Sequence, residues 1–129
     1  MEFNDGTVMS RDNFVIILED DLTANARYKW FVNGKHHVNF DLSDYEITPD
    51  NIRGTIIHEA YGHGVQGYSD ALNTHHKAYF ASIRSKYWTN TTLTFKKFTV
   101  NNMWKYYYNE VGYRPLPIDI HRIYTKYSD

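Results

Sequence analysis

The sequence predicts an α+β domain in which an N-terminal antiparallel β-sheet or hairpin is followed by three to four helices. The first third of the chain holds short apolar and alternating runs around the pair Asn33-Gly34, which is a strong signal for a two-residue hairpin turn. The remainder has apolar residues at helical spacing, interrupted by glycine and proline. No repeat or linker divides the 129 residues, so residues 1–129 are expected to form one domain.

Three strands are expected in the first third. Residues 14–18 are a five-residue apolar run, which predicts a strand buried on both faces. Residues 27–32 and 35–42 flank the Asn33-Gly34 turn and form the two arms of the hairpin. Apolar and polar residues alternate in the second arm, so one of its faces should contact the core and the other should contact water.

The helices follow. Thr48, Pro49 and Asp50 are typical of a helix start, because a hydroxyl caps the first turn, proline fits it and a carboxylate suits the positive end of the dipole. This helix should end between residues 64 and 67, where glycines recur. Further helices are expected at about 73–87 and 92–111, and a last short one from residue 117.

The composition limits the classes of function. The chain has no cysteine, which excludes a disulfide scaffold, a thiolate zinc site and a cysteine nucleophile. Any metal must therefore be held by histidine nitrogens and carboxylate oxygens. A net charge of −1 argues against nucleic acid as a partner. Three of the seven histidines show no pattern with other residues and are expected at the surface: His36, His37 and His121.

The most informative segment contains His58, Glu59, Gly62 and His63. In the zinc-hydrolase signature His-Glu-x-x-His, two histidines four residues apart bind zinc from one helical face, and the glutamate activates water. Here the histidines are five residues apart, which places them about 140° apart on a regular α-helix. One π-type turn would bring the two side chains back together, and such turns occur mostly at functional sites. Gly62 lies inside this turn, where the missing side chain permits the wider helix.

This segment resembles the His-Glu-x-x-Gly-His form of the zinc motif found in the dipeptidyl peptidase III family of metallopeptidases. The match covers six residues, of which four are the fixed ones. The resemblance implies Zn²⁺ on His58 and His63 and a general base at Glu59, on a zincin-like active-site helix. That family takes its third ligand from a glutamate on a later helix, and no glutamate of this chain is assigned to that position.

Three later side chains are alternatives for the third ligand: Asp70, His75 and His76. His76 is preferred, because it shares a helical face with apolar residues and should point toward the core, where the first helix lies. Asp70 is the next choice, although it could instead orient a ligating histidine or cap the following helix. His75 points about 100° away from His76 on the helix. Its side chain should therefore face solvent, or support a ligand, or serve as the alternative ligand. The hydroxyl of Tyr61 or Tyr68 could donate to an oxyanion.

A broader resemblance covers roughly half of the chain, from residue 57 to residue 113. Its motifs are His-Glu-x-x-Gly-His-Gly, Gly67-Tyr68-Ser69-Asp70, Thr74-His75-His76-Lys77-Ala78-Tyr79 and Lys86-Tyr87-Trp88. This pattern looks like the C-terminal toxin domains of bacterial Rhs/YD-repeat polymorphic toxins. The resemblance implies an effector domain excised from a larger secreted polypeptide, delivered into a target cell and neutralised by a cognate immunity protein. We expect no signal peptide within these residues, and no apolar run in them is long enough to span a membrane.

The expected function is therefore that of a zinc-dependent hydrolase, in first place a metallopeptidase acting on a protein or peptide as a secreted antibacterial effector toxin. A water would occupy the fourth zinc position, and Glu59 would take its proton. A metal-dependent nuclease toxin is the first alternative, which the net charge weakens. A non-catalytic binding module with a structural zinc site is the second. The strand at 35–41 could offer its edge to an extended peptide.

Overall fold

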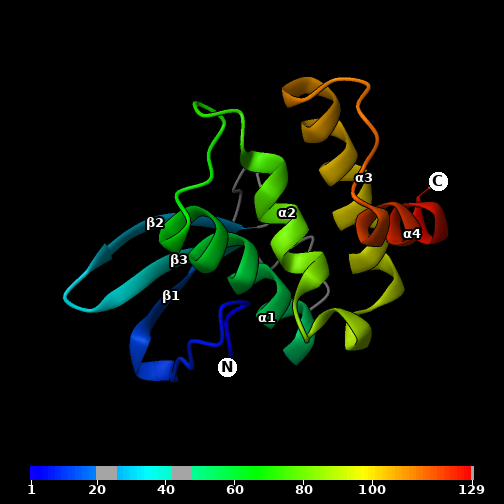
Figure 1. Cartoon of the computed structure of the whole chain (residues 1–129). Coiled ribbons are helices and arrows are strands. Elements are labelled where there is room, and N and C mark those ends of the chain that lie inside the picture. Colours follow the sequence, from blue (N-terminus) through cyan, green and yellow to red (C-terminus); the bar gives the residue numbers. More distant parts are fainter. Residues whose placement is uncertain (20–25, 42–47, 129) are drawn as a thin grey trace.

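The computed structural model describes residues 1–19, 26–41 and 48–128, and within these ranges a three-stranded sheet precedes four α-helices (Figure 1). The predicted α+β class, with strands first and helices after them, is confirmed. Within the same ranges, no helix combines the length and the apolar character that crossing a membrane requires.

The sheet has the strand order β1-β3-β2. The strands are β1 (Phe14–Glu19), which follows the short helix η1 (Arg11–Asn13), β2 (Ala26–Val32) and β3 (Lys35–Asp41). β2 and β3 form the predicted antiparallel hairpin, and both turn residues have positive φ, 54° at Asn33 and 74° at Gly34. Residue 42, the predicted end of the second arm, lies outside the described residues. β1 pairs with β3 in parallel, so the sheet is mixed, and the predicted antiparallel pairing holds for the hairpin. The hairpin already occupies one edge of β3, and β1 pairs with the other.

The observed burial of β1 and β3 differs from the predicted burial, because it depends on the position of each strand in the sheet. β1 is an edge strand, and the exposed fractions of Ile16, Ile17 and Leu18 are 42%, 43% and 63%, so it is not buried on both faces. β3 is the central strand, and both Val38 on one face and Asn39 on the other are buried. β3 therefore has no free edge for a peptide. Among the described residues, no strand pairs with the outer edge of β2, where the backbone N–H of Tyr28 donates to Glu59 instead.

The helices begin and end close to the predicted residues. They are α1 (Pro49–Ile56), η2 (Ile57–Val65), α2 (His75–Arg84), η3 (Trp88–Asn90), α3 (Leu93–Glu110) and α4 (Ile118–Tyr127). The side chain of Thr48 caps α1 by accepting a hydrogen bond from the backbone N–H of Asn51, as the sequence predicted. α3 ends before Gly112, whose φ of 91° suits glycine.

Two groups of buried side chains hold these elements together. One lies between the sheet, α1, η2 and α2, and the other joins α2, α3 and α4. Figure 1 shows α2 in the middle of the molecule, with the sheet and α1 on one side and α3 and α4 on the other. α2 thus faces both cores, and η2 is packed between α2 and the sheet.

Gly62 sets how closely η2 approaches α2. A Cβ atom at this position would lie 2.8 Å from Cβ of Ala78 and 3.1 Å from its Cα. The glycine therefore permits close contact between two helices as well as a wider helical turn.

We expect Gly62→Ala to lower the free energy of unfolding by about 1–3 kcal/mol, because the added methyl overpacks this contact. Urea denaturation monitored by circular dichroism measures the loss. The double variant Gly62→Ala/Ala78→Gly removes the clash and should recover part of the stability. If the second substitution adds to the loss, the explanation by close packing is wrong.

Candidate metal centre

The nine residues of η2, Ile57–Val65, form a π-helix, as the spacing of its histidines predicted. The wider turn places the side chains of His58 and His63 on the same face. Their Nε2 atoms are 3.2 Å apart and their ring centroids 4.9 Å apart. The five-residue spacing is therefore compatible with two ligands of one metal ion.

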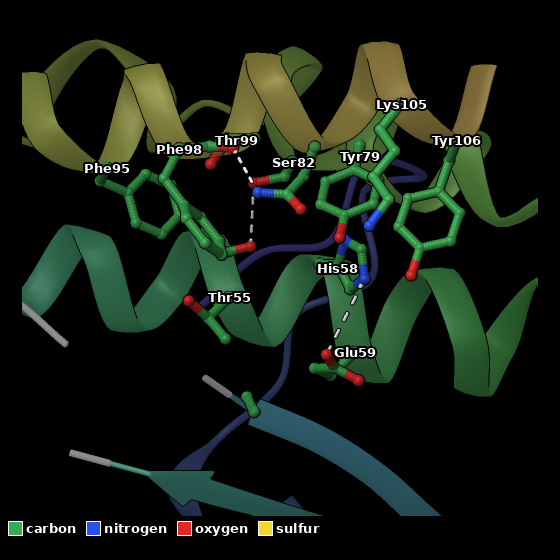
Figure 2. A pocket seen from close by; sticks show the side chains of 13 residues that line it. Thr55, His58, Glu59, Tyr79, Ser82, Phe95, Phe98, Thr99, Lys105 and Tyr106 are labelled. Carbon is green, nitrogen blue, oxygen red and sulfur yellow. Dashed lines mark hydrogen bonds and ion pairs between the residues drawn. The ribbon is translucent and has the colours of Figure 1, made fainter. Parts of the chain in front are cut away.

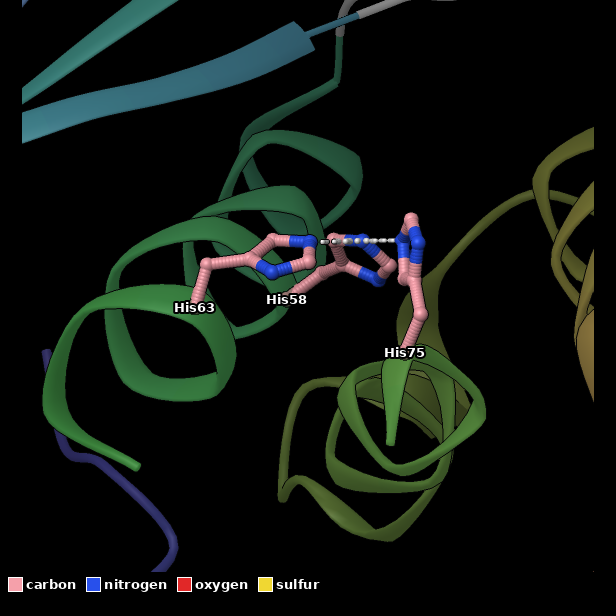
Figure 3. A group of neighbouring side chains, drawn as sticks. All are labelled: His58, His63 and His75. Carbon is pink, nitrogen blue, oxygen red and sulfur yellow. Dashed lines mark hydrogen bonds between the residues drawn. The ribbon is translucent and has the colours of Figure 1, made fainter. Parts of the chain in front are cut away.

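His75, the first residue of α2, supplies a third imidazole (Figure 3). Its Nε2 lies 3.3 Å from Nε2 of His58, and one nitrogen from each of His58, His63 and His75 lies within 4.8 Å of the other two. Zinc–nitrogen bonds of about 2.0–2.1 Å in a tetrahedral arrangement separate two ligand nitrogens by about 3.3–3.4 Å. The distances from Nε2 of His58 to Nε2 of His63 and to Nε2 of His75 therefore match the distance between two nitrogen ligands of a tetrahedral zinc ion.

The second nitrogens of two of these rings show which tautomer is present. Nδ1 of His63 lies 2.6 Å from the carbonyl oxygen of Tyr68, and Nδ1 of His75 lies 2.7 Å from Oδ1 of Asp70. Both partners accept, so each Nδ1 carries a proton, and in a neutral ring Nε2 then presents a lone pair. Both lone pairs face Nε2 of His58, which can donate to only one of them. A cation between the three nitrogens would satisfy all of them at once.

The environment favours the neutral rings that a metal needs. Burial lowers the pKa of His58 well below its usual value, and the neighbouring His63 and His75 lower it further. Burial also lowers the pKa of His63. Neutral imidazole is the form that binds a metal, so these two side chains do not have to lose a proton near neutral pH.

Glu59 is buried beside the three histidines. Its Oε2 accepts a hydrogen bond of 2.8 Å from the backbone N–H of Tyr28 in β2, and its Oε1 lies 3.8 Å from Nε2 of His58 (Figure 2). Strand β2 thus holds one carboxylate oxygen and leaves the other facing the histidines. Burial raises the pKa of Glu59 to about 8, against the lowering effect of the Tyr28 N–H and of Arg27. The charge of a bound metal would lower this pKa.

His76, the preferred third ligand, lies outside the metal-binding group. Its Nδ1 donates to Oε1 of Glu110 at 2.9 Å, and both side chains are buried. Glu110 also accepts the backbone N–H groups of His75 and His76, so a side chain from α3 caps the start of α2. His75 takes the position beside His58 instead. Asp70 does not belong to the metal-binding group, and its side chain does not cap α2. Its contact with His75 matches the remaining alternative, that it orients a histidine.

We expect Asp70→Ala to weaken zinc binding about 10- to 100-fold, because Asp70 orients the His75 ring and increases the basicity of its Nε2. Competition with a chromophoric chelator measures the affinity. Asp119, another largely exposed carboxylate, pairs with Arg84 on the surface, so Asp119→Ala is the matched control and should bind zinc like the wild type. Equal affinities in the two variants would contradict this role of Asp70.

The tyrosines that surround the centre are only partly those expected. Tyr68 lines the cavity at the three histidines, whereas the ring of Tyr61 packs against Phe3 and lines neither cavity of the centre. Tyr79 and Tyr106 were not expected there. The ring of Tyr79 lies 4.3 Å from that of His58, and the ring of Tyr106 lies 4.1 Å from that of His75. Tyr79 follows His75 by four residues on one helix, a spacing that could have indicated it. Tyr106 reaches the centre only because α3 packs on α2.

Two cavities meet at the centre. The larger, of about 570 Å³, is lined by all three histidines, by Asp70 and by residues of β2. The smaller, of about 320 Å³, extends between α1 and α3 (Figure 2). His58, Glu59, Tyr79 and Tyr106 line both cavities. The centre is thus accessible from one side and adjoins a narrower space on the other.

The remaining histidines do not belong to the centre. His121 is exposed and His37 is half-buried, but His36 is buried, with its Nδ1 3.1 Å from the hydroxyl of Tyr28. The expectation that His36 lies on the surface is therefore wrong. Its position in the central strand, on the face toward the core, explains its burial.

Comparisons with known protein families, with curated proteins and with solved structures gave no match.

Proposed function

We propose that this protein is a zinc-dependent hydrolase, and that it is a metallopeptidase. The observation that carries the proposal is the convergence of three imidazole Nε2 atoms beside a buried carboxylate, Glu59. Three histidines are a common ligand set of catalytic zinc, and a neighbouring glutamate provides a base.

Each side chain has a role in this proposal. His58, His63 and His75 would hold the ion, and a bound zinc ion acidifies water and polarises a carbonyl group. Glu59 would accept the proton of the attacking water on Oε1, since Oε2 is occupied by the N–H of Tyr28. It would then pass that proton to the departing amine.

Three features favour a catalytic metal over a structural one. Structural zinc sites have four protein ligands, whereas the metal-binding group within the described ranges has three. A cavity of about 570 Å³ adjoins the histidines and leaves room for a substrate. A buried glutamate next to a ligand is of no use to a structural site, because it adds a charge without binding the metal.

A peptide fits this cavity better than a phosphodiester does. Arg27 is the only lysine or arginine among its described lining residues, and Glu59 and Asp70 line it as well. A nucleic-acid site needs several cations along the phosphates. Ala26, Arg27 and Tyr28 of β2 line the same cavity, along an edge with which no described strand pairs. The N–H of Tyr28 is bound to Glu59, so an extended peptide would bind through the remaining backbone groups of this edge.

Metal analysis and proteolysis test the proposal together. The purified protein should bind one zinc per chain, and it should cleave peptides in a denatured proteome, as identified by mass spectrometry. A chelator should abolish cleavage, and added zinc should restore it. Metal-dependent cleavage of nucleic acid without peptide cleavage would favour the nuclease instead. A chain that binds no zinc would refute both.

The biological role rests on the resemblance to polymorphic toxins. We propose an effector that is delivered into a target bacterium as part of a larger polypeptide and is inhibited by a cognate immunity protein. Expression of the wild-type chain in a susceptible bacterium should arrest growth, and Glu59→Gln should not. Growth unaffected by the active wild-type enzyme would refute the role as a toxin.

A further inference from the structure

We infer that the smaller cavity, of about 320 Å³, is the binding pocket for one large apolar side chain of the substrate, with an aromatic ring as its best occupant. This inference rests on the proposed function, because it assigns the substrate class of the same metal centre. The pocket would accept the uncharged side chain of a residue that adjoins the hydrolysed bond.

The size and position of the cavity support a single side chain. Ligand pockets for whole small molecules span about 300–1,000 Å³, so this cavity is at the lower limit and is too small for an extended peptide. It adjoins the centre, because His58, Glu59, Tyr79 and Tyr106 line both cavities. A substrate in the larger cavity can therefore extend one group into the smaller one.

The walls are aromatic where the cavity lies farthest from His58. Figure 2 shows Phe95 and Phe98 at the end away from His58, whereas Lys105 and Glu59 lie at the His58 end. Gly54 also lines the cavity, and a Cβ atom there would lie 3.1 Å from Cζ of Phe95. The far end thus offers ring surface and no charged group among the described lining residues. Aromatic rings pack well against such walls.

Several polar groups of the lining are already paired. The hydroxyl of Thr55 donates to the carbonyl of Asn51 at 2.9 Å, and the hydroxyl of Ser82 donates to the carbonyl of Gly54 at 3.0 Å. The amide of Asn102 donates to the carbonyl of Phe98 at 2.9 Å. These donors do not require a partner from the ligand. An apolar occupant leaves their hydrogen bonds intact, whereas a charged group at the far end would lose its hydration with no charged side chain beside it, since Lys105 and Glu59 lie at the His58 end.

Two hydroxamates that differ only in the presence of a phenyl-bearing side chain measure how much the pocket contributes to binding. With zinc-loaded protein, 3-phenylpropanohydroxamate should bind about 10- to 100-fold more tightly than acetohydroxamate, because its ring is transferred from water to an apolar site. Isothermal titration calorimetry gives both affinities without any assay of activity. Equal affinities would overturn the inference.

Matched variants on α3 show whether the ring occupies this cavity. Asn102→Phe fills the cavity and should bring the affinity ratio close to one. Leu93→Ala removes an exposed apolar side chain of the same helix that lines neither cavity, and it should keep the wild-type ratio. A ratio that is equally high in Asn102→Phe and in the wild type would overturn the inference.

A probe without a metal-binding group separates this inference from the proposed function. Phenylacetamide added to the metal-free protein should shift the amide NMR signals of Gly54 and Thr99, which line the cavity. These shifts would support the pocket even if no peptide were cleaved. Their absence would refute it even in an active peptidase.

Discussion

Replacing Glu59 by glutamine is expected to lower kcat/KM for peptide hydrolysis by about 10²- to 10⁴-fold, the usual contribution of a general base. Glutamine has nearly the same shape, and its amide oxygen can still accept the N–H of Tyr28. Its amide cannot take up a proton from water. Kinetics with a peptide identified from the proteome, together with the zinc content of the same sample, measure the effect.

The zinc content separates loss of the base from loss of the metal. Glu59→Gln should keep one zinc per chain, because three histidines form the metal-binding group. Glu2→Gln is the control, since Glu2 pairs with Lys86 on the surface, and it should retain wild-type kinetics. Undiminished activity in Glu59→Gln would rule out Glu59 as the base.

The second large effect is expected from His75, and its neighbour His76 provides the contrast. Four-ligand zinc sites bind with about 10–16 kcal/mol, so the loss of one ligand costs about 3 kcal/mol. His75→Ala should therefore bind zinc at least about 100-fold more weakly than the wild type. His76→Gln should bind zinc with nearly wild-type affinity, because His76 contacts Glu110 and not the centre.

The cost of His76→Gln should appear in stability. The substitution disturbs a buried hydrogen bond to Glu110, and breaking such a buried pair costs up to about 3–5 kcal/mol. Thermal unfolding of the metal-free proteins should therefore show a lower midpoint for His76→Gln than for His75→Ala. Strong loss of zinc in the folded His76→Gln variant would contradict the assignment of His75 as ligand.

Part of the centre could be predicted because its geometry is local. His58, Glu59 and His63 lie within six residues, so the spacing and the rise of a helix determine whether their side chains can meet. The same holds for the hairpin, whose turn depends on the positive φ that Asn33 and Gly34 adopt. Neither feature depends on the packing of one helix or strand against another.

The third histidine of the group could not be predicted, because an apolar pattern indicates that a side chain is buried but not which element it packs against. His76 does face a core, as expected. Its ring lies 5.3 Å from that of Phe80 and 5.4 Å from that of Tyr107, in the core that α2 shares with α3. The preference for His76 assumed that this core also contained the first helix. α2 has cores on two sides, and the His75 ring lies in neither of them but beside His58 and His63 of η2.

Short-range spacing and backbone preference were therefore enough to predict the positions of the strands and helices, the π-turn and the two neighbouring histidines, His58 and His63, with Glu59 between them in the sequence. Tertiary packing supplied the rest. The packing of α2 between η2 and α3 brings His75 to the centre as the third imidazole and Tyr106 beside it, and the packing of η2 on β2 orients Glu59. These contacts join residues far apart in the chain, and side-chain packing selects them only when the helices are assembled.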